Sequence, residues 1–353
     1  MPLLARMVAT PVVVDVRRGV LASLGDLLAD QRISSGGRVA VVVGKTSGDA
    51  LRERLAADLP QADWLVADDG SLDEATRLAE VIHQGSYDAV VGIGGGRVLD
   101  TTKFVAARVG LPMVAVATNL AHDGIASPVS ILDNATGRGS YGVPMPIAVV
   151  VDLDEVRNAP RDMVIAGIGD ALSNLSAVAD WELSRVETGE AVDGLAVTLA
   201  RTAGEAVLYR DGGVEDDGFL VSLAEGLVLS GLAMSVSGTS RPCSGACHEI
   251  SHAIDRLHPA KSGPHGFQVG VGAVFASFLR GDRRLADSLA ACLRRHGLPV
   301  VPSDLGLTVD EFAAAVSFAP QTRPGRYTIL EHLDLDESEV RIWVEGYVAA
   351  YDR

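Results

Sequence analysis

The chain has 353 residues, 48% of them hydrophobic and 22% charged, which is the composition of a soluble globular protein long enough for two domains. Its formal net charge of −16, from 46 acidic and 30 basic residues, disfavours nucleic acid and anionic membranes as partners. The sequence has no run of roughly eighteen or more apolar residues, no secretory pattern in residues 1–16 and only three cysteines, so we expect a cytoplasmic protein without transmembrane helices or structural disulfides.

Short apolar segments alternate with helical patterns in the first 150 residues. Four of these segments predict strands: residues 38–44 (RVAVVVG), 62–67 (ADWLVA), 87–94 (YDAVVGIG) and 112–118 (PMVAVAT). Helical patterns separate them, for example at residues 49–59 and 71–85. Continuous apolar strands separated by helices predict a parallel sheet covered on both faces, which is a Rossmann-like α/β domain. We expect a further extended pair at residues 130–143 and 147–154.

Long Ala/Leu/Val-rich helical stretches follow after about residue 154, and few strand patterns remain. Examples are residues 162–184, 194–210 and 219–238. We therefore expect an all-α C-terminal domain. The predicted division is an α/β nucleotide-binding domain at 1–155 and a helical metal- and substrate-binding domain at 156–353.

Two loops that follow predicted strands carry polar or glycine-rich patterns. Residues 92–100 (GIGGGRVLD) place glycines between a strand and a helix, where backbone N–H groups bind phosphate, although the spacing is not GxGxxG and a tight turn is the alternative. In residues 118–127 (TNLAHDGIAS), Thr118 and Ser127 are candidates for cofactor contacts, and His122 and Asp123 for substrate contacts. Loop capping is the alternative for this second loop.

Four histidines, His248, His252, His258 and His265, cluster within eighteen residues. His248 and His252 are four residues apart and so share a helix face, and the segment HPAKSGPHG then breaks the helix and places His265 at the start of the next one. Imidazoles that converge with a carboxylate form zinc or iron sites. Each histidine alone is also compatible with a capping or solvated role.

Two other metal chemistries fit the same segment. HEISH matches the HExxH pattern of zinc peptidases, with Glu249 as general base and His258 as third histidine, but Asp255 stands where the long form of that motif has glycine. Cys243, Cys247 and His248 would make a softer site, although cysteines at this spacing are more often buried filler.

Five segments in this order, GIGGGRVLDTTK, TNLAHDGIASP, GIGDALSNLSAVADW, SGTSRPCSGACHEISHAID and HGFQVGVGAV, resemble the sn-glycerol-1-phosphate dehydrogenase family over about residues 10–350. That family lies in the superfamily of iron-containing alcohol dehydrogenases and dehydroquinate synthase. The resemblance implies a dehydroquinate synthase-like fold. It also implies that Asp170, His248 and His265 hold a divalent metal, usually zinc, with iron or nickel as alternatives. A metal would compensate the lone carboxylate of Asp170 in its apolar helix.

The resemblance further assigns catalytic roles to Asp170 and His252, and substrate contacts to Asp123, Asp170 and His252. The positions that it implies for the cofactor, NAD or NADP, are Gly44 at the end of the first strand, Gly95, Gly96, Arg97, Val98 and Leu99 at the glycine-rich turn, and Thr118, Asn119, Leu120, Ala121 and Ser127 in the second loop. The chain departs from the family pattern at Ala121, Cys247, Phe267 and the loop HPAKSGP, which affects the substrate pocket rather than the metal ligands.

The implied activity is the NAD(P)H-dependent reduction of dihydroxyacetone phosphate, or a related carbonyl phosphate, to sn-glycerol 1-phosphate, as in phospholipid biosynthesis. The alternatives are a dehydroquinate synthase-like cyclase, a zinc peptidase and a non-catalytic binding protein. We expect a small phosphorylated substrate and a homo-oligomer. Because Gly44 and Lys45 stand where a carboxylate would repel a 2′-phosphate, and no carboxylate follows before Asp49, we expect NADP(H) to be accepted at least as well as NAD(H).

Overall fold

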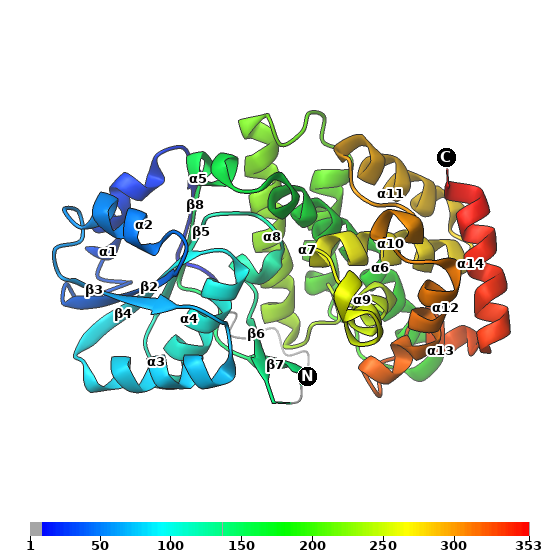
Figure 1. Ribbon diagram of the computed structural model, residues 1–353, viewed down its shortest axis with the longest axis horizontal. Helices are drawn as coiled ribbons and strands as arrows, with labels where there is room; N and C mark the ends of the chain where they lie inside the picture. Colours follow the sequence, from blue (N-terminus) through cyan, green and yellow to red (C-terminus); the bar gives the residue numbers. More distant parts are fainter. Residues whose placement is uncertain (1–8, 136, 353) are drawn as a thin grey trace, which may run out of the picture. The chain divides into compact units, whose positions relative to one another are not determined.

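The computed structural model describes residues 9–135 and 137–352, so the first half of the segment assessed for a secretory signal, residues 1–8, lies outside the described residues. The chain forms two compact units that divide between Pro160 and Arg161 (Figure 1). The division falls after the predicted position at 155/156, because helix α5 (Leu153–Asn158) still belongs to the first unit.

A six-stranded parallel sheet forms the centre of the first unit, in the strand order β1-β8-β5-β4-β2-β3. Its strands are β1 (Val13–Arg17), β2 (Arg38–Gly44), β3 (Ala62–Ala67), β4 (Tyr87–Gly94), β5 (Met113–Ala117) and β8 (Ala148–Asp152). The helical segments that accompany them are η1 (Val20–Ser23), α1 (Leu24–Leu28), α2 (Gly48–Leu55), α3 (Leu72–Gln84), α4 (Gly96–Val109) and η2 (Asp123–Ile125). The predicted parallel α/β architecture is confirmed.

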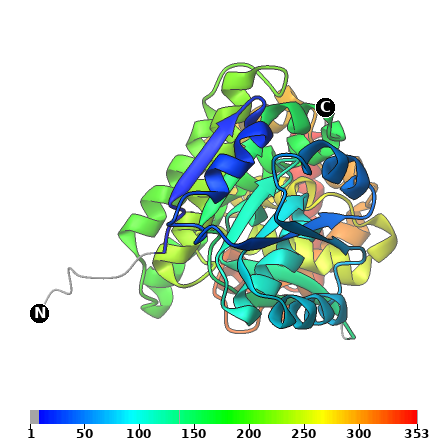
Figure 2. The same cartoon turned by 90° about the vertical axis from the view of Figure 1, so that its left-hand side faces the viewer.

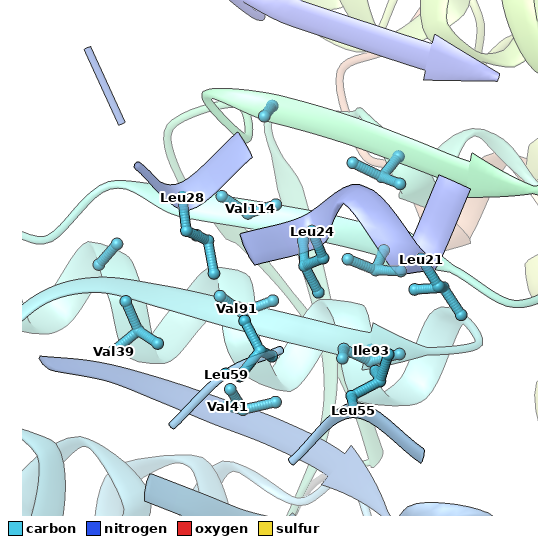
Figure 3. Close-up of a cluster of buried hydrophobic side chains, with 14 of the residues drawn as sticks. Leu21, Leu24, Leu28, Val39, Val41, Leu55, Leu59, Val91, Ile93 and Val114 are labelled. Carbon is cyan, nitrogen blue, oxygen red and sulfur yellow. The ribbon is translucent and has the colours of Figure 1, made fainter. Parts of the chain in front are cut away.

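The central strands β2, β4, β5 and β8 are buried on both faces, which explains why their sequences are almost continuously apolar. Alternate residues of β2 and β4, such as Val41 and Val91, point toward leucines of α1 and α2, such as Leu24 and Leu55 (Figure 3). Burial of each such leucine contributes about 1.5–3 kcal/mol. This core fixes the sheet from which the loops at the carboxyl ends of the strands emerge.

Three strand assignments differ from the sequence prediction. Residues 130–143 fold on themselves into an antiparallel hairpin, β6 (Val129–Asn134) with β7 (Gly137–Gly142), and do not pair with 147–154. Strand β8 instead enters the main sheet between β1 and β5. Strand β1, drawn dark blue in Figure 2, was not predicted and lies at one edge of the sheet beside β8.

The second unit is helical throughout its described residues, as predicted. Its α-helices are α6 (Arg161–Thr188), α7 (Gly194–Leu208), α8 (Asp217–Ser237), α9 (Ala246–Leu257), α10 (His265–Leu279), α11 (Arg283–His296), α12 (Val309–Phe318), α13 (Ile329–Leu333) and α14 (Glu337–Tyr351). Short 3₁₀ turns connect them: η3 (Pro259–Lys261), η4 (Pro302–Leu305) and η5 (Ala319–Thr322).

Helix α8 corrects the expectation that nothing in this chain has the length and apolarity of a membrane span. Its 21 residues meet both criteria, but 61% of the apolar window is buried within the protein, where α8 packs against α7. An apolar core helix passes the same test of length and composition, so this helix is weak evidence for a membrane.

Candidate active site

Close backbone contacts between α6 and α10 bring two of the predicted metal ligands together. A Cβ on Gly169 would lie 2.0 Å from the carbonyl oxygen of Gly266, and a Cβ on Gly266 would lie 1.7 Å from the carbonyl oxygen of Ala166. Only glycine allows this approach. The next residue after Gly169 is Asp170, and the residue before Gly266 is His265, so the glycine contact sets the separation of these two side chains.

The third predicted ligand comes from α9, whose first turn is anchored to α6. The buried carboxylate of Asp180 accepts a hydrogen bond from the Ala246 backbone N–H at 2.8 Å, and it also pairs with Arg280 at 2.8 Å. A Cβ on Gly272 of α10 would lie 2.9 Å from the Cα of Cys247, so α9 and α10 also pack closely. His248, one residue further along α9, therefore faces the other two ligands.

Asp170, His248 and His265 each offer a ligand atom, and these atoms all lie within 4.8 Å of one another. The Nε2 atom of His265 lies 3.8 Å from Oδ1 of Asp170, and the His248 and His265 rings are 5.0 Å apart between centroids. One carboxylate with two imidazoles is a donor set suited to Zn²⁺ and related divalent metals. Burial and the neighbouring histidines hold the pKa of His248 well below its usual value, so its ring is neutral, the form that binds a metal.

A chain of hydrogen bonds orients the ring of His265. Gln268 accepts from the Ser251 hydroxyl at 2.6 Å, and its amide nitrogen donates to Asp255 at 3.2 Å. Because the Ser251 hydroxyl proton is committed to Gln268, Ser251 accepts from Nδ1 of His265 at 3.2 Å. In the metal-binding form of the ring, Nδ1 therefore carries the proton and Nε2, which faces Asp170, offers its lone pair. Sequence reasoning missed Ser251 and Gln268, because neither residue type indicates a metal site.

The other residues of the zinc-peptidase motif, His252, His258 and Glu249, do not belong to the three-ligand cluster. His252 lies outside the three-ligand cluster, and its Nε2 atom is 3.3 Å from a guanidinium nitrogen of Arg323. His258 bonds the backbone carbonyl of Glu311 at 3.2 Å. Glu249 is fully buried, accepts from the Thr328 hydroxyl at 3.2 Å, and has its pKa raised to about 9 by burial. A buried, protonated Glu249 bonded to Thr328 does not fit the general base of a zinc peptidase.

In the first unit, the predicted cofactor residues gather at one edge of the sheet. The chain leaves β2 toward β3 and leaves β4 toward β5, so the strand order reverses between the neighbouring strands β2 and β4. Ligands of open α/β sheets bind at such a point, beyond the carboxyl ends of the strands. Gly44 ends β2, and Gly95 and Gly96 follow β4, which places all three at this point.

Packing requires glycines in this turn, and the same turn offers free backbone N–H groups to a ligand. A Cβ on Gly95 would lie 2.5 Å from the Asn119 amide, and a Cβ on Gly96 would lie 2.3 Å from the His122 ring. Helix α4 begins at Gly96, and its first N–H groups are free of intrahelical partners and available to a phosphate. Val98 and Leu99 direct their side chains into the core, so only their backbone could meet a ligand.

Residues 118–127 form the loop after β5. The Thr118 N–H bonds the Gly94 carbonyl at 3.1 Å, and the Asn119 side chain accepts from the Ala121 N–H at 3.2 Å, while Leu120 is buried. Ser127 is buried beside Lys103, whose ammonium lies 3.3 Å from its hydroxyl.

Two polar side chains of the same loop have shifted pKa values. His122 accepts from the Gly124 N–H at 3.0 Å, and burial lowers its pKa. Burial raises the pKa of Asp123, the predicted substrate contact, to about 6.

The expectation that no carboxylate lies near Gly44 before Asp49 was wrong. Strand β3 pairs with β2 so that Ala67 lies opposite Gly44, and Asp68 directly follows Ala67. Asp68 forms an ion pair with Lys45 at 2.9 Å. Lys45 is therefore partly neutralised at the position where it was expected to attract a 2′-phosphate.

Comparison with known proteins shows which family has this arrangement. A model of the iron-containing alcohol dehydrogenase family matches residues 15–160. A glycerol-1-phosphate dehydrogenase [NAD(P)+] from Thermofilum pendens is 37% identical over 332 residues, covering 91% of this chain and 92% of the relative. One from Methanospirillum hungatei is 35% identical over 324 residues, covering 88% and 86%. The chain belongs to the glycerol-1-phosphate dehydrogenase family.

A solved structure also resembles this member of the glycerol-1-phosphate dehydrogenase family along its whole length. The crystal structure of a probable glycerol dehydrogenase from Sinorhizobium meliloti superposes with a TM-score of 0.79 at 26% identity, covering 99% of each chain. The predicted combination of a Rossmann-like α/β domain with an all-α domain is thus confirmed at the level of the fold.

Proposed function

We propose that this protein is a metal-dependent dehydrogenase that reduces dihydroxyacetone phosphate to sn-glycerol 1-phosphate with NADH or NADPH. The observation that carries the proposal is the convergence of Asp170, His248 and His265 within 4.8 Å in a chain 35–37% identical to glycerol-1-phosphate dehydrogenases. A dehydroquinate synthase-like cyclase and a non-catalytic protein are less well supported, because these relatives are named as dehydrogenases.

The reaction adds a hydride to the carbonyl carbon of the substrate and a proton to its oxygen. When bound, the dinucleotide supplies the hydride, and a divalent metal held by the three ligands polarises the carbonyl and stabilises the resulting alkoxide. NAD(P)⁺ and the alcohol are the products, so the reduction consumes one proton.

The remaining residues orient the substrate and supply the proton. Arg323 can only donate hydrogen bonds, so Nε2 of His252 accepts from it and the ring proton lies on Nδ1. We assign His252 to protonate the alkoxide directly or through water. In the first unit, we assign Gly95, Gly96 and Arg97 to the pyrophosphate and Asp123 to the substrate.

The protein acts on a small molecule, and we propose the cytoplasm as its location and a homo-oligomer as its form. The three cysteines, Cys243, Cys247 and Cys292, are all buried and none is in a disulfide, which is compatible with a reducing compartment. Burial raises the pKa of Cys247 to about 12, so its thiol stays protonated and is a poor ligand for the soft metal site considered above.

The metal ligands are tested by changing each to alanine in the full chain. We expect Asp170→Ala, His248→Ala and His265→Ala to lose bound metal and dihydroxyacetone phosphate reduction while circular dichroism shows an intact fold. His258→Ala is the control, because that histidine bonds a backbone carbonyl outside the cluster. Cofactor oxidation, with and without chelator, measures activity, and elemental analysis measures metal. Full metal content in all three ligand variants would refute the assignment.

A further inference from the structure

We propose that Arg323 and Arg326 form the subsite that holds the phosphate group of the substrate, with Arg323 in direct contact. The inference rests on the proposed function in that it identifies the anion with the substrate phosphate. Both residues lie in the segment RPGR between η5 and α13, in the same unit as the metal ligands. Sequence analysis assigned neither residue a role.

The positive charges of these two arginines are uncompensated. Among the described residues neither forms a salt bridge: Arg323 donates to His252, and Arg326 donates to the Ser244 carbonyl and, at 2.9 Å, to the Ser240 hydroxyl. Two other largely buried arginines of this unit are paired, Arg241 with Glu190 and Arg280 with Asp180, both at 2.8 Å. Two partly buried cations that lack an ion-pair partner, in a chain of net charge −16, indicate an anionic ligand.

Desolvation and mutual repulsion act on both guanidinium groups. Burial lowers the pKa of Arg323, and burial followed by repulsion from Arg323 lowers the pKa of Arg326 to about 10. Both groups remain charged near neutral pH. A bound dianion would relieve the repulsion and replace the lost hydration, so the site is better suited to a phosphate than to a neutral hydroxyl.

The location fits a substrate whose carbonyl is at the metal cluster. Arg323 contacts His252, which stands one helical turn after His248 on α9, and the His252 and His265 rings stack at 6.4 Å. In dihydroxyacetone phosphate the phosphate is only a few bonds from the carbonyl carbon. A guanidinium next to His252 is therefore at a suitable distance to bind the phosphate while the carbonyl is reduced.

The geometry of the segment supports different roles for the two arginines. Gly325 has φ of +86°, a left-handed conformation that turns the chain between them. Arg326 is held by its bonds to the turn before α9, whereas the single bond of Arg323 leaves most of its donors free. Arg323 can thus bind phosphate through two parallel N–H groups, and Arg326 is a positioning residue that adds charge.

The kinetic test compares phosphorylated and unphosphorylated substrates in the metal-loaded enzyme. For Arg323→Gln we expect KM for dihydroxyacetone phosphate to rise roughly 10- to 100-fold, with a much smaller fall in kcat/KM for dihydroxyacetone, which keeps only the contribution of Arg323 to orienting His252. Arg323→Lys keeps the charge without the planar fork and should be intermediate. Arg284→Gln, which removes an exposed arginine from α11, is the matched control and should behave as the parent. Equal losses on both substrates would instead show a structural role and overturn the proposal.

A binding test without turnover separates the subsite from the proposed function. With saturating NADPH present to fill the pyrophosphate site, inorganic phosphate should raise the melting temperature of the parent and of Arg284→Gln above that in chloride of equal ionic strength, but not that of Arg323→Gln. If the parent binds phosphate in this way yet fails to reduce dihydroxyacetone phosphate, the proposed substrate is wrong and the subsite stands. If phosphate stabilises parent and Arg323→Gln alike, the subsite is wrong, whatever the activity.

Discussion

Asp68 lies beside Lys45 at the carboxyl ends of two paired strands, and this contact limits how much positive charge the sheet edge offers to a dinucleotide. Both side chains are more than half exposed, at 73% for Lys45 and 52% for Asp68. Such an exposed pair contributes little to stability. Its main effect is electrostatic: the carboxylate competes with any phosphate for the ammonium group.

We predict that Asp68→Asn shifts cofactor choice toward NADP(H). Removal of the carboxylate frees Lys45 for the 2′-phosphate, and the ratio of kcat/KM for NADPH to that for NADH should rise about three- to tenfold. Gly44→Asp should lower the same ratio, because a carboxylate there repels the 2′-phosphate. Its Cβ would meet only the Val98 side chain, at 3.2 Å. Asp73→Asn, an exposed change on α3, is the control. An unchanged ratio in both variants would count against this cofactor site.

Residue chemistry was predictable where a side chain acts by its own type and local spacing. Asp170, His248 and His265 were assigned by resemblance, and the structure brings their ligand atoms together. Asp68 was not expected beside Lys45, because only the order of strands in the sheet makes β2 and β3 neighbours. Arg323 lies 71 residues after His252 in an irregular loop, so no periodic pattern in the sequence connects the two residues.

At the scale of elements, the metal cluster depends on helices that approach one another through glycine. Gly169, Gly266 and Gly272 each leave no room for a Cβ against a neighbouring backbone. Each metal ligand is next in sequence to one of these glycines or to a residue that it contacts. Asp170 follows Gly169, His265 precedes Gly266, and His248 follows Cys247, the contact of Gly272. Helix separation, rather than the ligand side chains alone, therefore determines whether three donors can reach one ion.

We predict that Gly266→Ala weakens metal binding although residue 266 carries no ligand. The added methyl would meet the Ala166 carbonyl at 1.7 Å, so α6 and α10 must move apart and separate Asp170 from His265. Overpacking of this kind costs about 1–3 kcal/mol, and we expect the affinity for Zn²⁺ to fall at least about tenfold. Gly263→Ala, with open space around its Cβ, is the control. Zinc titration against a competing chelator decides, and equal affinities in both variants would contradict this account.

The strands that were predicted most directly are the central ones. Segments 38–44 and 87–94 coincide with β2 and β4, because a central parallel strand is apolar at nearly every position. Segment 62–67 coincides with β3, an edge strand that is mostly half-buried but still largely apolar. Strand β1 is also an edge strand, and its five residues are no more than half-buried, which gives a weak signal. The position of β8 within the sheet depends on long-range pairing that a local pattern does not encode.

At the scale of the whole molecule, stability should depend on pH through a buried histidine that is not one of the metal ligands. His296 ends α11, is 4% exposed, and packs against Phe219 with ring centroids 4.8 Å apart. Burial, followed by the charges of Arg295 and Arg161, lowers its pKa from 6.5 to about 4. The unfolded chain thus binds the proton more tightly than the folded protein between these values.

We predict that this histidine makes the protein less stable as the pH falls from about 6.5 to about 4. Its contribution is fully present above the unfolded pKa and is lost in that window, by up to about 3 kcal/mol. His296→Gln cannot be protonated and should lose correspondingly less stability. Urea unfolding at pH 7 and pH 4.5, in chelator so that metal release does not contribute, measures the difference. The same loss in both proteins would show that His296 does not titrate in this way.

The pairing of β1 with β8 has a consequence for how the first unit is made. Within residues 9–135 and 137–160, β1 is the first strand of this unit to leave the ribosome, and the one strand it pairs with is the last of the unit. The buried carboxylate of Asp152, at the end of β8, also accepts from the N–H groups of Gly19 and Leu21, at 3.1 and 3.0 Å. During synthesis, β1 and the turn after it therefore stay unpaired until almost the whole unit has been translated. We expect the pairing of β1 with β8, which closes this long loop, to be a slow step in the folding of the unit.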